Sequence, residues 1–85
     1  MEINIQEWID KLTESNIKED LLHLEILHFY HHNPGTIDDV EGIARRLGRD
    51  TQSVSKCIDD FVKIKLLSKV KVGSRELIMV SAEGA

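Results

Sequence analysis

Two helical patterns that are separated by only three residues constrain the fold of this chain more than any other feature. Apolar residues recur at helical spacing in residues 40–47 and again in residues 51–65, and Gly48 begins the short break between them. Gly48 is expected to end the first helix, and Asp50 to cap the second through its side-chain oxygen. The sequence therefore predicts two consecutive helices that are joined by a tight turn.

The apolar pattern then changes from helical to alternating. In the segment LSKVKVGSRELIMVS, Val70 and Val72 alternate with polar residues on one arm, and Leu77 and Met79 alternate on the other. A turn at Gly73–Ser74 separates the two arms. Alternation on both sides of a glycine turn predicts a β-hairpin.

Two more helices are predicted in the N-terminal part of the chain. Residues 4–14 carry an apolar stripe at helical spacing, which consists of Ile5, Trp8, Ile9 and Leu12. Asn16 is expected to cap a second helix, because Glu19, three residues later, completes a capping-box pattern. Apolar residues go most of the way round that helix, so it should pack on more than one side.

The second helix is expected to end near His32. Asn33 tolerates the left-handed conformation that closes a helix, and Pro34 cannot continue one. A brief extended segment, GTI, follows, and Asp38 or Asp39 then caps the next helix.

The chain is expected to form a single domain over residues 1–85, with an N-terminal helix (1–15), a core (16–81) and a tail (82–85). Its 85 residues, 41% hydrophobic and 31% charged, suit one small globular core. The one cysteine, Cys57, excludes an internal disulfide and a cysteine-rich zinc site, which favours a reducing cytoplasm. No apolar run approaches the roughly 20 residues that span a bilayer, so we expect a cytoplasmic protein without a membrane partner.

The net charge of −4 conceals two halves of opposite sign. Residues 1–41 hold ten acidic and two basic residues, which gives −8, whereas residues 42–85 hold nine basic and five acidic residues, which gives +4. A basic C-terminal half is what phosphate recognition requires, and the acidic half would have to face elsewhere.

These elements occur in an order known from a family of regulators. The matching residues are Ile43-Ala44 between two helices, Leu47-Gly48 in the turn, Val54 and Ile58 inside the following helix, and Leu66-Leu67 before the hairpin. Over residues 20–81 the chain resembles the winged helix-turn-helix superfamily, as in MarR- and ArsR-like transcription regulators. Such proteins often place glycine where this chain has Lys65, so we do not expect a left-handed turn there.

The resemblance implies an α+β, mostly α, fold: a winged helix-turn-helix with one additional N-terminal helix and a C-terminal hairpin wing. It also implies a transcriptional regulator that binds double-stranded DNA, with no cofactor. The same fold also serves as a protein-protein interaction module without DNA binding, and this remains the alternative.

The helix that begins at Thr51 has one apolar face and one polar face. At 100° per residue, Cys57, Ile58 and Phe61 fall within about 60° of Val54, and the polar side chains lie opposite. The residues expected to contact bases are Thr51, Gln52, Ser53, Ser55 and Lys56. Cations expected to contact phosphate or a minor groove are Arg45, Arg46 and Arg49 beside this helix, and Lys69, Lys71 and Arg75 on the hairpin.

Two carboxylates on the same helix favour the alternative reading of a solvated face. Asp59 and Asp60 would repel phosphate, and they have i,i+4 partners in Lys63 and Lys56. They lie one to two turns beyond the expected contact end. The sequence therefore favours DNA contact without excluding an interaction-only module.

A histidine cluster ends the second helix. His28, His31 and His32 fit one helical face, yet no further ligand pattern accompanies them, and cations in a last turn are stabilised by the helix dipole alone. We therefore expect no metal site there, and expect His23 to pack or to be solvated. Cys57 is expected to be a buried structural cysteine. No catalytic motif occurs, so an enzyme is not expected.

A homodimer is the last expectation. Two-fold DNA sites are commonly read by symmetric dimers. The helix of residues 4–14 is expected to contribute to the dimer contact, because its apolar stripe must be buried against something, and packing within its own chain is the alternative.

Overall fold

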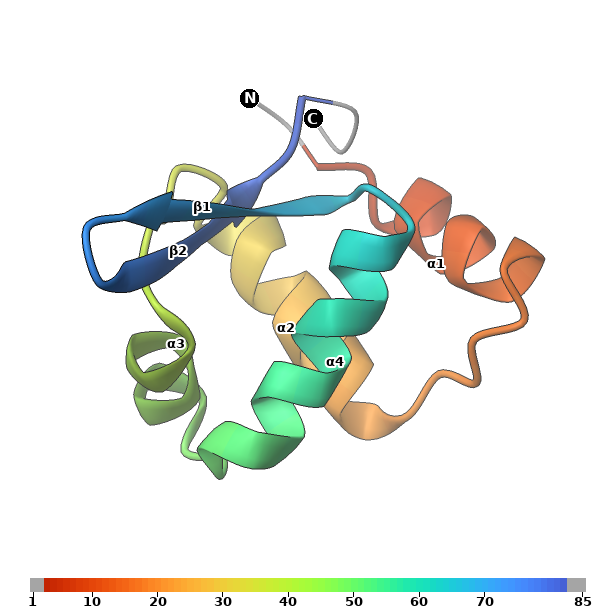
Figure 1. Cartoon of the computed structure of the whole chain (residues 1–85). Coiled ribbons are helices and arrows are strands. Elements are labelled where there is room, and N and C mark those ends of the chain that lie inside the picture. The colour runs from red at the N-terminus through yellow and green to blue at the C-terminus, as the bar shows by residue number, and fades with distance from the viewer. Residues whose placement is uncertain (1–2, 83–85) are drawn as a thin grey trace.

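Residues 3–82 are described by a computed structural model, in which four helices precede an antiparallel hairpin (Figure 1). The elements are α1 (Ile5–Glu14), α2 (Leu21–His32), α3 (Val40–Leu47), α4 (Thr51–Lys63), β1 (Leu67–Val72) and β2 (Arg75–Val80). α2 and α4 pack together at the centre, with α1 on one side and α3 with the hairpin on the other (Figure 1). This arrangement confirms the predicted α+β, mostly helical fold. No helix in the described part is long and apolar enough to cross a membrane.

Aspartates begin α3 and α4 where the sequence predicted them. Asp39 Oδ1 accepts the backbone N–H of Gly42 at 2.8 Å, and Asp50 Oδ2 accepts that of Ser53 at 2.9 Å. These N–H groups lack a partner within their helix, so the carboxylates satisfy them and hold the pKa of both aspartates low. Gly48 ends α3 in the left-handed conformation, with φ 67°.

The predicted start of α2 is wrong by about one turn. The helix begins at Leu21, and its capping box joins Asp20 to His23, whereas the prediction joined Asn16 to Glu19. Asn16 instead adopts a positive φ of 58°, which asparagine tolerates better than most residues, and reverses the chain after α1.

The end of α2 also differs from the prediction in its conformation. Asn33 ends the helix with φ −134°, outside the left-handed region, and both its backbone N–H and its side-chain amide donate to the carbonyl of Phe29, at 2.9 and 3.0 Å. Asp38, which directly follows the expected extended segment GTI, pairs with Ile78 of the hairpin through an isolated bridge. In it, the N–H of Ile78 donates to the carbonyl of Asp38 at 2.7 Å.

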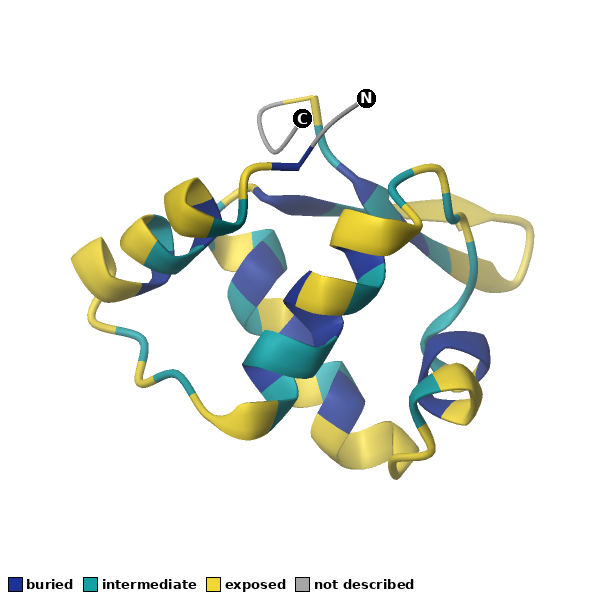
Figure 2. Ribbon diagram, turned by 180° about the vertical axis from the view of Figure 1, so that it is seen from behind, coloured by how far each residue is buried: buried dark blue, intermediate teal, exposed yellow. Residues whose placement is uncertain are grey.

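The apolar stripe of α1 packs within its own chain. Trp8 is 1% exposed and Leu12 is fully buried, and the ring of Trp8 lies 5.5 Å from that of Phe61 on α4. Figure 2 shows buried positions on α1 between exposed ones. α1 therefore completes the core over α2 and α4, which settles where this stripe is buried.

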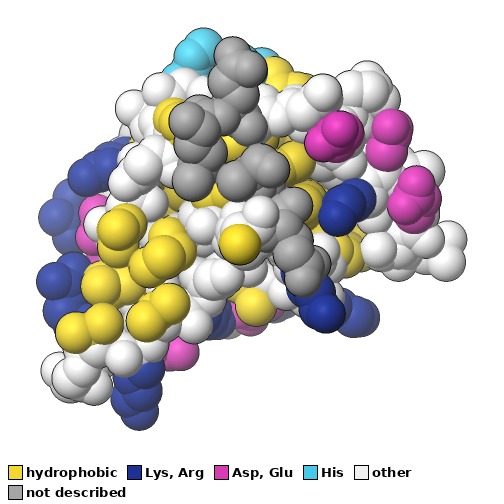
Figure 3. All heavy atoms as spheres, turned by 90° about the horizontal axis from the view of Figure 1, so that it is seen from above, with side chains coloured by type: hydrophobic (Ala, Val, Ile, Leu, Met, Phe, Trp, Pro, Cys, Tyr) yellow, Lys and Arg dark blue, Asp and Glu magenta, His cyan; other side chains and the backbone are white. Residues whose placement is uncertain are grey.

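The hairpin buries one face and exposes the other. Its register pairs Leu67 with Val80, and these two side chains are buried together with Ile78. The alternating residues from which the hairpin was predicted lie on the outer face, where Val70 is 40% and Val72 is 56% exposed. Figure 3 shows hydrophobic side chains gathered over this part of the surface.

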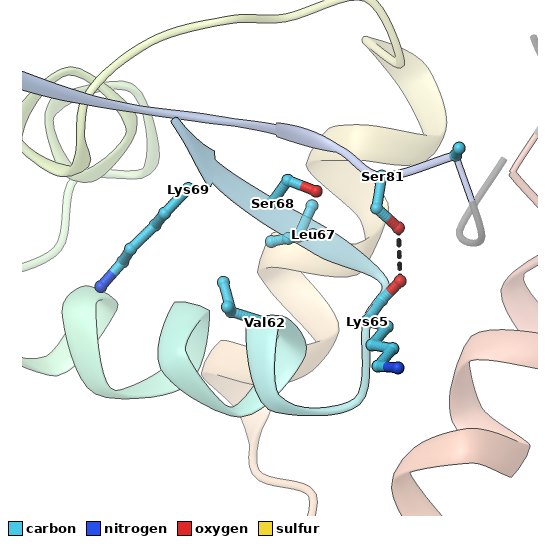
Figure 4. Close-up of a pocket in the computed structure, with 7 residues that line it drawn as sticks. Val62, Lys65, Leu67, Ser68, Lys69 and Ser81 are labelled. Carbon is cyan, nitrogen blue, oxygen red and sulfur yellow. Dashed lines mark hydrogen bonds between the residues drawn. The ribbon is translucent and has the colours of Figure 1, made fainter. Parts of the chain in front are cut away.

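The turn between α4 and β1 corrects a second prediction. α4 ends at Lys63, about two residues earlier than expected, and Lys65 does adopt the left-handed conformation, with φ 66°. Leu66 is buried here, and its N–H donates to the carbonyl of Phe61 at 2.9 Å. The hydroxyl of Ser81 donates to the carbonyl of Lys65 (Figure 4), so the end of β2 also holds the turn.

Candidate nucleic-acid interface

The first half of α4 presents an exposed polar face. Gln52, Ser53 and Lys56 are exposed, whereas Val54 and Ile58 on the opposite face are fully buried. The helical geometry deduced from the sequence is thus the one in the structure. The exposed residues of this face are short, amide or cationic, and such side chains hydrogen-bond base edges.

A groove joins this face to the turn of the wing, the β1–β2 hairpin. It is lined by Thr51 and Ser55 of α4, by Asp39, Val40 and Glu41 of α3 and its cap, and by Ser74, Arg75 and Glu76 of the wing. Thr51, Ser55 and Arg75, all predicted site residues, are therefore brought together. The groove also holds acidic side chains, which the prediction did not include.

Carboxylates at the start of α3 hold the wing arginine in place. Arg75 Nη2 lies 3.1 Å from Asp39 Oδ2 and 3.6 Å from Asp38 Oδ1. The pKa of Asp39 is lowered, first by the N–H of Gly42 and then by Arg75. Arg46 Nη2 lies 3.5 Å from Asp38 Oδ2, and its guanidinium sits over a ring of α2, 5.9 Å from the centroid of Phe29. Asp38 thus links α3 to the wing.

Two further predicted cations are paired with carboxylates from other elements. Arg49 makes two contacts with Glu25 of α2, one of them from Nε to Oε1 at 2.9 Å, and this hydrogen bond lowers the pKa of Glu25. Lys69 extends from β1 over α4 and pairs with Asp59 (Figure 4). Asp59 therefore takes its partner from the wing, and the expected i,i+4 pairing with Lys63 is replaced.

Three predicted cations have no carboxylate partner within residues 3–82. Arg45, Lys56 and Lys71 are exposed, and none of them forms an ion pair with another described residue. Lys56 was expected to pair with Asp60, but Asp60 turns to His23 instead. Because no described carboxylate forms an ion pair with them, these three side chains present the cationic charge most available to phosphate.

His23 is the functional candidate that sequence reasoning missed. It is 4% exposed, and its Nε2 lies 2.8 Å from Asp60 Oδ2 while its Nδ1 lies 2.9 Å from Asp20 Oδ1. Cys57 is buried beside it, as expected of a structural cysteine, and burial is the main cause that raises its pKa to about 12. The spacing of Asp20 to His23 and of Cys57 to Asp60, i,i+3 in both cases, was the only local signal.

The histidines at the end of α2 do not converge on a ligand site with other described residues. The rings of His28 and His32 stack with centroids 6.3 Å apart, and His31 Nδ1 lies 2.9 Å from the carbonyl oxygen of Ile3. Within the described residues, the group that has the spacing of metal ligands consists of Asp20, His23 and Cys57.

Comparisons with known proteins bear on the fold. Neither a protein-family model nor a curated protein matches the sequence. Among solved structures, the chain is similar to the solution NMR structure of a homodimeric winged helix-turn-helix DNA-binding domain from Mycobacterium bovis, a possible ArsR-family transcriptional regulator. The TM-score is 0.65 at 16% identity, over 93% of this chain and 68% of that chain. This similarity confirms the predicted winged helix-turn-helix fold.

Proposed function

We propose that this chain is a small transcriptional regulator that binds double-stranded DNA and reads the major groove with the first half of α4. The observation that carries the proposal is the exposed polar face of α4 beside the groove that leads to the wing turn. The M. bovis domain, which has the same fold, is a DNA-binding domain. The major groove of DNA admits one α-helix. Gln52 and Ser53 would bring amide and hydroxyl groups there that hydrogen-bond base edges.

The cations divide into two roles in this proposal. Arg45, Lys56 and Lys71 contact phosphate, because none of them forms an ion pair with another described residue. Arg46, Arg49 and Arg75 were expected to bind DNA as well, but each forms an ion pair within the chain. They position α3, α4 and the wing, and contact DNA only with the donors that their carboxylates leave unused.

Salt dependence of duplex binding tests this proposal. Affinity for mixed-sequence duplex DNA should fall steeply between 50 and 200 mM salt, because each phosphate that the protein neutralises makes the slope of log K against log salt more negative by about 0.9. Arg45→Ala should make that slope less negative by about 1, and Lys63→Ala, an exposed lysine at the far end of α4, should leave it unchanged. Absence of binding at 50 mM salt would falsify DNA recognition.

Base readout is tested separately once a preferred site has been selected from random duplexes. Gln52→Ala should cost about 1 to 3 kcal/mol on that site and little on random DNA, whereas Arg45→Ala should weaken binding to both. Equal losses from Gln52→Ala on both sequences would remove Gln52 from base recognition.

We also propose that the chain acts as a symmetric dimer, as the M. bovis domain is homodimeric. The stripe of α1 is buried within its own chain, so its contribution to the contact is no longer part of the proposal. A mass measurement in solution at about 100 μM is the test, since a protein that is monomeric there does not dimerise at ordinary concentrations.

The second candidate function is a protein-protein interaction module without DNA binding. Two observations favour it: four of the expected cations are neutralised by carboxylates, and the outer face of the wing exposes Val70 and Val72. The duplex measurement at 50 mM salt separates the two functions, because only DNA contact produces salt-dependent binding.

A further inference from the structure

At the contact between α2 and α4, the buried ring of His23 faces both a donor and an acceptor of Asp20, whose Oδ1 also accepts the backbone N–H of His23 at 3.0 Å. His23 Nδ1 lies 3.2 Å from the backbone nitrogen of Asp20 and 2.9 Å from Asp20 Oδ1. An unprotonated Nδ1 accepts the backbone N–H but points its lone pair at a carboxylate oxygen. A protonated Nδ1 satisfies the carboxylate but leaves the N–H without its acceptor. Neither state of the ring satisfies both neighbours.

A third group with lone pairs adjoins these two. Cys57 Sγ of α4 lies 3.9 Å from Asp20 Oδ1, and one ligand atom from each of Asp20, His23 and Cys57 lies within 4.8 Å of the others. The thiol is 5% exposed, and the carboxylates of Asp20 and Asp60 add to burial in keeping it protonated. Three atoms of the kinds that bind metals, from two helices, therefore lie close together at this contact.

We propose that Asp20, His23 and Cys57 bind a divalent transition metal ion, and that the ion is zinc. Imidazole, thiolate and carboxylate together form a ligand set that suits Zn²⁺. Tetrahedral bonds of about 2.0 to 2.3 Å place ligand atoms roughly 3.3 to 3.7 Å apart, and the separations of 2.9 and 3.9 Å at Asp20 Oδ1 lie on either side of that range.

The charges of the ligands and their access to solvent both suit a zinc ion. On binding, Cys57 transfers its thiol proton to solvent, so that one thiolate and the Asp20 carboxylate balance the two positive charges of the metal. The side chain of Asp20 is 63% exposed, which gives the ion a path from solvent and leaves room for a water as fourth ligand.

Asp60 and Phe61 form the surroundings that such a site requires. Asp60 Oδ2 accepts from His23 Nε2 at 2.8 Å, which favours the imidazole tautomer with an unprotonated Nδ1, and the metal would replace the backbone N–H of Asp20 as the partner of that nitrogen. The ring of Phe61 meets the imidazole edge-on at 5.7 Å and closes the apolar side. A carboxylate behind a ligating histidine is the usual arrangement in zinc sites.

Cobalt(II) is the probe, because its absorption reports both geometry and thiolate ligation. The full, reduced and metal-stripped chain is titrated with Co²⁺, and Zn²⁺ is then added in competition. We expect one ion per chain, the visible bands of tetrahedral cobalt and a thiolate-to-cobalt charge-transfer band, all of them abolished by Zn²⁺. Zn²⁺ should also raise the thermal unfolding midpoint, because it binds only the folded chain.

Three variants and one control variant test which residues bind the ion. Cys57→Ser should abolish the charge-transfer band, and Asp20→Asn, which keeps the helix cap, should greatly weaken binding. Asp60→Asn should lower the affinity by about 10- to 100-fold while leaving the bands in place. The matched control is the double variant His28→Ala/His32→Ala, which should bind like the parent chain.

Three results would overturn the site. They are no uptake of Co²⁺ or Zn²⁺ at 1 mM, a cobalt spectrum without the thiolate band, and binding that the double histidine variant abolishes but Asp20→Asn does not. Because Asp20→Asn changes a largely exposed side chain and keeps the cap, its loss of binding is separable from misfolding by circular dichroism.

Discussion

The two halves of α4 use the same helix in opposite ways. From Thr51 to Lys56 the outward side chains are exposed and have no ion-pair partner among the described residues. From Cys57 to Lys63 both aspartates are paired with other elements: Asp60 with His23 of α2, and Asp59 with Lys69 of the wing, while Lys63 is exposed. The first half is available to a partner. The second half, called the fastened half below, is held by contacts with other elements of its own chain.

The difference shows how a small domain keeps a binding helix rigid. An 85-residue chain has little core to spare, and the second half of α4 is held by α1 through Trp8, by α2 through His23 and by the wing through Lys69. The exposed half is held by its one buried side chain, Val54, and by the cap at Asp50. Substitutions in the first half of α4 should therefore change the affinity for DNA, and substitutions in the second half should change the free energy of unfolding.

The largest expected effect is at Phe61, in the fastened half. Its ring is fully buried between Trp8 and His23, so Phe61→Ala should lower the free energy of unfolding by about 3 to 5 kcal/mol, a large share of what a small domain has. Gln52→Ala in the exposed half should change it by less than about 0.5 kcal/mol. Urea unfolding followed by circular dichroism measures both, and similar losses would contradict the division.

A smaller effect separates two neighbouring carboxylates. Asp60→Ala leaves the buried Nε2 of His23 without its partner, and should cost about 1 to 3 kcal/mol of stability. Asp59→Ala removes an ion pair whose carboxylate side chain is 57% exposed, and should cost less than about 1 kcal/mol. Urea unfolding of both single variants under identical conditions decides this, and a larger loss at Asp59 would show that the wing, rather than α2, holds this end of α4.

Features that depend on neighbours in the sequence were predicted well. The caps of α3 and α4, the break at Gly48 and the outward face of α4 follow from local hydrogen bonding and from 100° per residue. The start of α2 was predicted wrongly because two residues compete for the same role. Asn16 and Asp20 both suit a cap, and only the packed structure shows that Asn16 is used to turn the chain.

The partners of the charged side chains could not be predicted from the sequence, for a different reason. Arg49 finds Glu25 at a separation of 24 residues, and His23 finds Asp60 at 37. Such partners are fixed by how helices cross, which no local pattern encodes. The charge of the C-terminal half was read correctly from the sequence, but the share of it already neutralised by the N-terminal half was not.

The smallest expected effect lies at the turns that bound α4. Gly48 before the helix and Lys65 after it adopt nearly the same conformation, with φ 67° and 66°, yet only one of them is glycine. A left-handed L-residue costs about 1 to 2 kcal/mol, and glycine loses about 0.5 to 1 kcal/mol more backbone entropy on folding. Lys65→Gly should therefore raise the free energy of unfolding by about 0.5 to 1 kcal/mol, and Gly48→Ala should lower it by a similar amount.

Urea unfolding of the two variants against the parent chain measures these changes. A Cβ at position 48 would meet no atom within 4 Å, so a loss there reports backbone strain alone. If Lys65→Gly instead lowers stability, the lysine side chain contributes more than its strained backbone costs. The fastened end of α4 would then depend on Lys65 itself, and not only on the hydrogen bond that Ser81 donates to its carbonyl.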